Sequence, residues 1–600
     1  MRGAPGRKSV VYLLVLILFV VLAIVYTRPL VAQADDHLIG AAGGDNYFNI
    51  YVLSWDVHAL GTSPLNLFNA TMFYPGARTL AFSDHELTSA LIAWPVLAAT
   101  GNGVLALNFA VFMTFVLSAM GAFLLVEHLA RDRAAGVAAG IVFGFAMYRT
   151  AQITHLQLLS AGFIPLAMLF LHRYTERKRP GDAFAFALFV VLQFWAVWSY
   201  GFYLLFALAV YLVVLAVFER RRLAPFLRRK ASAERRPAIR WSAWLLAAML
   251  AAGLLVLPFA VPYLKAQREN PSFSRSPDEV AAYSADLGDF LVAPPQSMVW
   301  GGLSSWARPA RYLRGNATER SLFTGVLPLL LAVAGGVFLF RRRTRRERFV
   351  LVFYVVLLVL ALILCLGPVL YIGGHAFGIR MPYRLMYRFF PGFKAIRTPA
   401  RIYVLALLSL CVLAGFGVRW IREKLGRRWD RVLVSLVMVV LLVLLFVEVL
   451  PGGLVMKRAP TESGFPGAFG WLATREEPSP YIVLPLAPYR PGEPSGMDDI
   501  VFAEYEPRRL YYNTANWRKM VNGYSGYVPE SYRDAVKAMS AFPSREAFAF
   551  LRERGVRFVV LESRLLEPGV LDRALQWAAR DPDVEVAYRD RAGPVLELVP

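Results

Sequence analysis

Long apolar blocks separated by short polar segments dominate the first 450 residues of the chain. An α-helix needs about 20 mostly apolar residues to cross the hydrocarbon core of a bilayer. The fold class that follows is an α-helical polytopic membrane protein. The pattern predicts about eleven membrane-spanning helices, at residues 10–26, 104–127, 134–150, 156–173, 182–198, 200–218, 241–264, 321–340, 349–371, 400–420 and 431–450.

The first apolar block has two interpretations. The small residues of Val31-Ala32-Gln33-Ala34 are typical of a signal-peptide cleavage site, and the block would then be a removed leader. The block is long for a leader and is followed by Thr27-Arg28-Pro29, which favours a retained helix. Both interpretations place the segment Gly43–Leu87 outside the cytoplasm.

Leu87–Thr100 is apolar but short and contains Pro95, so we expect a helix that lies in the membrane interface without crossing it. With a cytoplasmic N-terminus, all arginine-rich loops then fall on the cytoplasmic side, as the positive-inside rule requires. A full crossing by Leu87–Thr100 would invert every later loop. The arginine-rich loops are 131–133, 173–179, 219–240, 341–348 and 422–431.

The region after residue 450 is less apolar, and its pattern has a shorter period. We expect a transmembrane domain over 1–450, with its first outer loop at 29–103, and a small extracytoplasmic α/β domain over 451–600. The elements predicted for the α/β domain are strands at 481–486, 557–561, 584–588 and 595–599 and helices at 531–541, 544–555 and 571–580.

Composition supports the membrane assignment, because 57% of the residues are hydrophobic and the mean hydropathy is +0.47. The net charge of +23 comes from arginines clustered in the short loops between apolar blocks, so nucleic acid is excluded as a partner and a lipid bilayer is favoured. The two cysteines, Cys365 and Cys411, lie in apolar blocks and indicate neither a disulfide framework nor a thiolate metal site.

The first outer loop concentrates acidic and aromatic residues that the apolar blocks lack. Asp45 follows two glycines and precedes aromatic residues, and a carboxylate partly desolvated at a membrane surface gains basicity. An aspartate before an amphipathic helix is also an ordinary N-cap, so both roles stay open. Asp56 and His58 are expected on the solvated face of that helix.

A second cluster, Asp84-His85-Glu86, precedes the interface helix. These groups suit a helix start, a phosphate-bearing donor or a divalent metal, although their spacing matches no known metal-ligand pattern. His155 and Gln157 lie at an outer turn, where polar groups at membrane depth mark a site or pack between helices.

Arg397 and Arg401 stand at the outer end of the tenth predicted span, where the positive-inside rule disfavours arginine. Guanidinium groups bind phosphate with two hydrogen bonds, and a lipid phosphate lies at this depth. The alternative is that both side chains extend to the interface only to hydrate their charges.

The chain resembles the GT-C superfamily of membrane glycosyltransferases in GGDNYFNIYVLSW, TMFYPGARTLAFSDHEL, THLQLLSAGFIPL and RTPARIYVLALLSLCVLAGFG. Members have an N-terminal span, a large first outer loop with an acidic residue near its start, an interface helix and many further spans. They use polyprenyl-phosphate-linked sugars, and an acidic residue of the loop acts as base or positions the acceptor. Asp45 is followed by Asn46, where many members have Asp-Glu.

The resemblance implies an inverting glycosyltransferase of the inner or plasma membrane, acting at the extracytoplasmic face on a glycan, lipid or protein acceptor. Asp45 would be the base, Arg397 and Arg401 would hold the lipid phosphate, and no cofactor is expected, with a divalent metal as the alternative. Asp84, His85, Glu86, His155 and Gln157 would line the donor and acceptor site. The competing hypotheses are a transporter of lipid-linked material and a non-catalytic envelope assembly protein.

Overall fold

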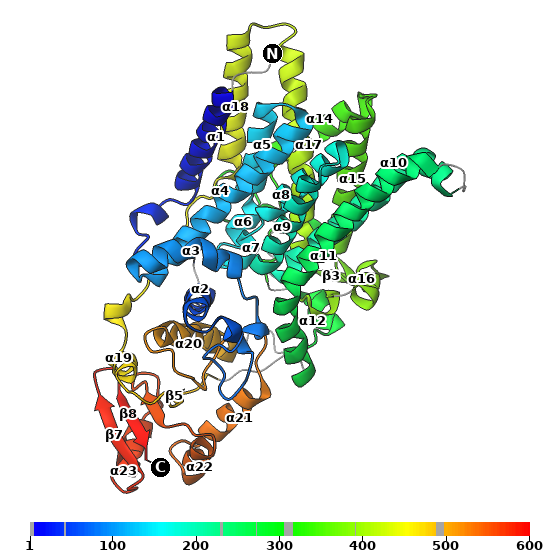
Figure 1. Cartoon of the computed structure of the whole chain (residues 1–600). Coiled ribbons are helices and arrows are strands. Elements are labelled where there is room, and N and C mark those ends of the chain that lie inside the picture. Colours follow the sequence, from blue (N-terminus) through cyan, green and yellow to red (C-terminus); the bar gives the residue numbers. More distant parts are fainter. Residues whose placement is uncertain are drawn as a thin grey trace. The chain divides into compact units, whose positions relative to one another are not determined.

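The computed structural model describes residues 5–40, 44–227, 232–271, 273–304, 316–390, 392–487 and 497–599. Within these ranges, nine helices are long and apolar enough to span a membrane, which confirms the predicted polytopic helical class. They comprise α1 (Pro5–Tyr26), α4 (Gly103–Ala130), α5 and α6 (Arg133–Gly144, Met147–Ala151), α7 and α8 (Leu156–Leu159, Phe163–Arg177), α10 (Trp198–Leu227), α11 (Ser232–Glu269), α15 (Arg345–Cys365), α17 (Tyr403–Leu425) and α18 (Arg431–Val449) (Figure 1).

Two further predicted spans form shorter helices, α9 (Pro180–Ala196) and α14 (Val326–Arg341). Although α14 is short, contacts near both of its ends join it to neighbouring helices. At its start, the Leu327 amide donates to Glu448 at the end of α18 over 2.9 Å. Just past its end, Arg342 pairs with Glu423 near the end of α17. Gly335 makes this packing close, because a Cβ there would lie 1.9 Å from the Leu413 carbonyl oxygen.

Two of the confirmed spans, predicted at 134–150 and 156–173, are each built from two helices with an interruption between them. The first is broken between Gly144 and Met147, and the second between Leu159 and Phe163. The second break frees the Ser160 carbonyl, which accepts a 3.0 Å hydrogen bond from the Gln193 side chain. A protein side chain thus supplies the hydrogen bond that lipid could not give to this backbone carbonyl.

The chain divides into two compact units. Unit 1 comprises Met1–Val31, Val111–Pro258 and Ser274–Leu454, and unit 2 comprises Ala32–Ala110, Phe259–Phe273 and Val455–Pro600. Unit 1 holds most of the apolar helices. Unit 2 combines the first outer loop with the C-terminal region.

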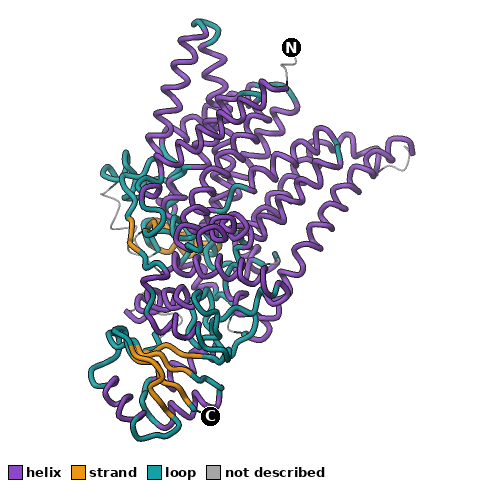
Figure 2. Tube along the Cα trace, turned by 60° about the vertical axis from the view of Figure 1, so that its left-hand side comes forward, coloured by secondary structure: helices purple, strands orange, loops and turns teal. Residues whose placement is uncertain are grey.

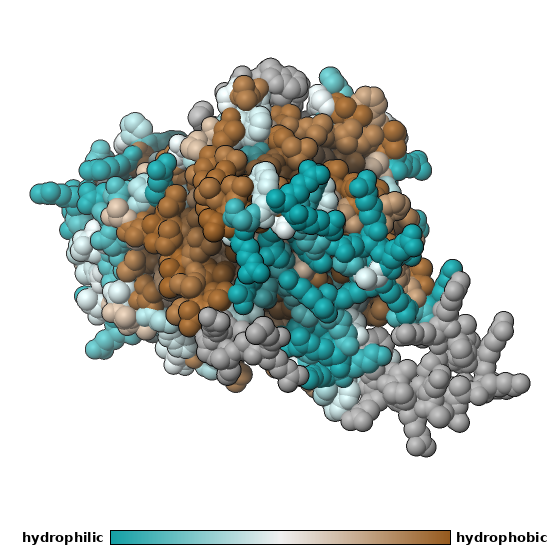
Figure 3. All heavy atoms as spheres, turned by 90° about the horizontal axis from the view of Figure 1, so that it is seen from above, coloured by the Kyte–Doolittle hydropathy of each residue, from teal (hydrophilic) through white to brown (hydrophobic). Residues whose placement is uncertain are grey.

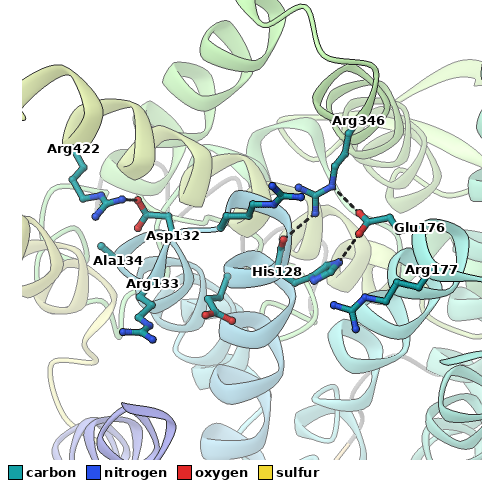
Figure 4. A pocket seen from close by; sticks show the side chains of 10 residues that line it. His128, Asp132, Arg133, Ala134, Glu176, Arg177, Arg346 and Arg422 are labelled. Atoms are coloured by element: carbon teal, nitrogen blue, oxygen red, sulfur yellow. Dashed lines mark hydrogen bonds and ion pairs between the residues drawn. The ribbon is translucent and has the colours of Figure 1, made fainter. Parts of the chain in front are cut away.

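The arginine-rich loops of unit 1 meet at one end of its helices, as the alternation of spans predicts. Glu176, in the last turn of α8, pairs with Arg346 of α15 over 2.7 Å and with His128 of α4 over 3.2 Å (Figure 4). Asp132 caps α5 and pairs with Arg422 of α17. The cytoplasmic location of this end, and with it the orientation of the termini, stays a prediction.

Apolar side chains cover broad areas of the surface (Figure 3). Leu254 on α11 is 71% exposed, Leu330 on α14 is 62% exposed and Val439 on α18 is 57% exposed. So much exposed apolar surface is unfavourable in water and is typical of helices that contact lipid.

Four strands of unit 2 form a sheet in the order β5-β6-β8-β7 (Figure 2), and two more, β1 (His37–Ile39) and β4 (Met456–Arg458), form a separate antiparallel pair. The parallel pair of the four-stranded sheet, β5 (Tyr481–Leu484) and β6 (Phe558–Leu561), is fully buried, as continuous apolar runs predict. The antiparallel strands are β7 (Val584–Arg589) and β8 (Pro594–Leu598). The helices between and around them are α19 (Gly467–Ala473), α20 (Met497–Asn513), α21 (Glu530–Met539), α22 (Arg545–Glu553) and α23 (Val570–Ala578).

Candidate active site

Helix α2 (Gly44–Thr62) carries the candidate base and packs against α3 (Leu87–Thr100) and α20 within unit 2. A Cβ on Gly44 would lie 2.0 Å from the Ala503 carbonyl oxygen, so only glycine permits this contact. Asp45 is the second residue of the helix and lies in its first turn. A carboxylate at this position interacts favourably with the positive end of the helix dipole.

Asp45 is half-buried, and its Oδ1 accepts a 2.9 Å hydrogen bond from the Tyr524 hydroxyl. The Tyr524 ring packs against Phe48 on the next turn of α2, with 5.4 Å between ring centroids. A residue 479 positions away in the chain therefore fixes the orientation of the Asp45 side chain. Such a contact is expected of a functional group whose geometry matters.

Asp56 is fully buried, which overturns the prediction that it lies on a solvated face. Neither of its carboxylate oxygens has a hydrogen-bond partner in the described part of the chain. Burial raises the pKa of Asp56 well above its ordinary value. The error arose because α20, which covers this helix, is far away in the sequence.

Glu86 is the centre of a carboxylate cluster formed by Asp45, Asp56, Asp84 and Glu86. It is 1% exposed, and its φ of +48° lies in the left-handed region that glycine favours. Burial and the negative charges of the other three carboxylates raise the pKa of Glu86 well above its ordinary value. The structure thus brings together three predicted site residues and one that the sequence assigned to solvent.

His85, the remaining residue of this predicted cluster, is buried in an aromatic environment. Its Nδ1 lies 3.1 Å from the Tyr263 hydroxyl, and its ring stacks on Phe259 at 5.2 Å. Burial lowers the pKa of His85 to about 3, so the imidazole is neutral near pH 7. A neutral imidazole supplies hydrogen bonds but no charge for a phosphate.

The carboxylate cluster distributes its charge unevenly. Buried Asp56 and Glu86 favour the protonated form, whereas Asp45 and Asp84 are half-buried and reach water. Neighbouring carboxylates titrate as a coupled set. Among the described residues, no three His, Cys, Asp or Glu side chains are grouped so that they could hold a metal ion.

Unit 1 holds the predicted arginines in a different environment. Arg401 binds Glu319 through Nε, 3.1 Å from each carboxylate oxygen, and through Nη2. Glu319 is 6% exposed and also accepts a 2.9 Å hydrogen bond from Gln152. Burial alone would raise the pKa of Glu319, but the charge of Arg401 holds it below its ordinary value.

Arg397 and His155 belong to the same environment, since their charges also act on Glu319. The Arg397 guanidinium lies over the ring of Tyr283, 4.5 Å from its centroid, and makes no ion pair among the described residues. Gln157 follows on α7, and its Oε1 is buried without a hydrogen-bond partner in the same part of the chain. Unit 1 thus brings three of its predicted site residues, Arg397, Arg401 and His155, to the neighbourhood of Glu319, and Gln157 lies two positions after His155 in the chain.

Sequence reasoning missed Glu319, Gln152 and Tyr524. Tyr524 lies in the stretch VNGYSGYVPESYRDAV, whose glycines and aromatics stand out in the sequence without indicating a role. Glu319 lies 82 residues from Arg401, and its only signal is an acidic residue just before an apolar block.

Comparison with known proteins defines the family. Residues 14–397 match the family described as "Domain of unknown function (DUF6311)", and the chain belongs to this family. No curated protein matches the chain.

Solved structures with a similar arrangement are membrane glycosyltransferases of the GT-C superfamily, the superfamily that the sequence resembles. One is the archaeal oligosaccharyltransferase AglB from Archaeoglobus fulgidus with an inhibitory peptide and a dolichol-phosphate, at 13% identity over 92% of this chain and 70% of that chain, with a TM-score of 0.44. Another is ArnT from Cupriavidus metallidurans bound to undecaprenyl phosphate, at 13% identity over 99% and 98%, with a TM-score of 0.41. With TM-scores below 0.5, neither likeness says what this chain does.

Proposed function

We propose that the chain is an inverting membrane glycosyltransferase that moves a sugar from a polyprenyl-phosphate-linked donor to an acceptor at the extracytoplasmic face. The observation that carries this proposal is the carboxylate cluster around Glu86 in a protein with many apolar helices. Buried carboxylates with raised pKa values are costly to keep and are characteristic of catalytic sites.

Asp45 is the general base in this mechanism. It takes the proton of the acceptor hydroxyl while the acceptor oxygen attacks C1 of the donor sugar. The bond between C1 and the phosphate oxygen breaks, and the lipid phosphate leaves with the electron pair. A single displacement of this kind inverts the configuration at C1. Asp56 and Glu86, whose raised pKa values favour the protonated form, keep the negative charge around Asp45 low.

The arginines of unit 1 bind the phosphate of the donor and stabilise its charge as it leaves. Arg397 is the principal ligand, because it makes no ion pair within the described residues, whereas Arg401 is paired with Glu319. Arg401 contributes Nη1, since its bonds to Glu319 use Nε and Nη2. His155 and Gln157 contact the donor, and Asp84 and His85 contact the acceptor.

The experiment is reconstitution of the full chain in liposomes with polyprenyl-phosphate-linked sugars labelled in the sugar. We expect label to reach an acceptor, with release of free polyprenyl phosphate, and we expect transfer to continue after divalent metals are removed with EDTA. Lipid-linked label that crosses the bilayer without loss of the lipid would instead support a transporter. Neither transfer nor translocation would support an assembly protein.

A further inference from the structure

Unit 2 contains a hollow of about 450 Å³ whose lining includes none of the four carboxylates of the cluster. Its walls come from α2, the end of α3, the start of α4, the end of α20 and residues 461–463. His58 lies 13 positions after Asp45 on the same helix. At a rise of 1.5 Å per residue, the hollow and Asp45 are about 20 Å apart along the helix axis.

One wall of the hollow is aromatic. The half-buried indole of Trp517 stacks on His58 with 4.6 Å between ring centroids and 17° between ring planes. Trp55 supports both rings from α2, at 5.6 Å from Trp517. Trp517 has a φ of +54°, an unfavourable backbone conformation for a bulky residue. Such strain is stored where a side chain must hold a particular orientation for a ligand.

The remaining lining is polar but nearly uncharged. Burial lowers the pKa of His58, so this imidazole is neutral near pH 7. Among the described residues that line the hollow, Glu462 is then the only charged one. A hollow of this kind does not favour a phosphate or another anion. Its hydroxyl and amide groups come from Ser54, Thr100, Asn102, Thr461, Ser463 and Thr514.

We propose that this hollow binds a neutral saccharide. A sugar ring presents an apolar face of C–H groups and an edge of hydroxyls, which match an aromatic wall and a rim of uncharged hydrogen-bonding groups. The inference rests on the proposed function in one respect: the saccharide is a distal part of a glycan acceptor. Distance from Asp45 makes Trp517 a binding residue and not a catalytic one.

The test is saturation-transfer NMR on the full chain in nanodiscs, with tetra- to hexasaccharides of glucose, mannose, galactose and N-acetylglucosamine as probes. We expect at least one probe to bind and Trp517→Ala to weaken its binding roughly tenfold. Trp471→Ala is the matched control, because Trp471 is also half-buried in unit 2 but lies outside the hollow.

A blocking variant keeps the test decisive if Trp517→Ala does not fold. Ser463 is exposed on the rim, so Ser463→Trp fills the hollow without disturbing a core, and Ser540→Trp is the control at another exposed site of unit 2. Binding that survives Ser463→Trp, or the absence of binding by every probe, would overturn the inference. Saccharide binding without sugar transfer would refute the proposed function alone, whereas transfer with an acceptor KM that Ser463→Trp leaves unchanged would refute this inference alone.

Discussion

The two units bury charge in opposite ways. In unit 1, Glu319 and Arg401 neutralise each other, and Gln152 completes the hydrogen bonding of the carboxylate. In unit 2, the charges that act on Glu86 are other carboxylates, and Asp56 has no hydrogen-bond partner among the described residues. A compensated pair is a way to hold structure together, whereas an uncompensated cluster lowers stability and needs a functional reason. The comparison assigns a structural role to the Glu319–Arg401 pair, which leaves Nη1 of Arg401 for the donor phosphate, and it assigns the acid–base chemistry to the cluster around Glu86.

The largest expected effect on stability is that of Glu319→Gln. The substitution leaves the Arg401 guanidinium without its counter-charge in a buried site, which costs about 3–5 kcal/mol. Thermal unfolding in detergent measures this loss of stability. Glu219→Gln is the control, because the pair of Glu219 with Arg345 is partly exposed and contributes about 0–1 kcal/mol. Equal losses in the two variants would remove the structural role of the Glu319 pair.

Arg397→Gln removes the predicted arginine of unit 1 that makes no ion pair within the described residues. Loss of a charge-assisted hydrogen bond to the donor phosphate costs about 1.5–3 kcal/mol, or roughly tenfold to a hundredfold in donor affinity. The donor KM of reconstituted protein measures it. Arg388→Gln, at an exposed arginine stacked on Phe389, should leave the donor KM unchanged. An unchanged KM in Arg397→Gln would leave Arg397 a packing role over Tyr283.

Glu86→Gln tests whether the stability contributions of Glu86 and Glu319 change with pH in opposite directions. The fold favours protonated Glu86, so its contribution to stability is complete below the ordinary glutamate pKa and is lost as pH rises through the raised pKa. Glu319 has a lowered pKa, so its contribution is lost as pH falls through that lowered value. We expect Glu86→Gln to be about 1–3 kcal/mol more stable than the native chain at pH 8, and no more stable at pH 4. The stability of the native chain and of Glu86→Gln would both be measured from pH 5 to pH 8. An equally steep rise in the two proteins would contradict the raised pKa of Glu86.

Tyr524→Phe has the smallest expected effect. It removes the hydroxyl that donates to Asp45 and keeps the ring that packs on Phe48, at a cost of about 0.5–1.5 kcal/mol. We expect kcat to fall a few-fold to roughly tenfold with the acceptor KM unchanged. Tyr505→Phe, at a half-buried tyrosine of α20, is the control. A loss in KM alone would make Tyr524 a binding residue.

Local pattern was enough to predict most of the elements. The apolar blocks became helices, and the runs YIVL and FVVL became the buried parallel strands β5 and β6. The interruptions at 145–146 and 160–162 escaped prediction, because the side chains that satisfy the freed backbone come from other helices. The hydropathy of a long apolar block does not reveal such short breaks, because it is averaged over many residues.

Long-range partners decided the candidate site, and a single sequence does not display them. Asp56 was assigned to solvent because α20, which buries its helix, begins more than 400 residues later. The pairing of Arg401 with Glu319 spans 82 residues, so the sequence revealed an unusual arginine without its counter-charge. The acidic content of the first outer loop was visible, but its convergence on Glu86 was a property of the fold.

The most direct test of the central claim is the rate of sugar transfer by Asp45→Asn, measured beside its melting temperature. Asparagine keeps the shape of the side chain and serves a helix start about as well as aspartate, but it accepts no proton. The account predicts an unchanged melting temperature and a rate lower by about 10²–10⁴-fold, with Asp84→Asn as the matched control in the same cluster. A near-native rate in Asp45→Asn, or a loss confined to Asp84→Asn, would contradict the assignment of Asp45 as the base.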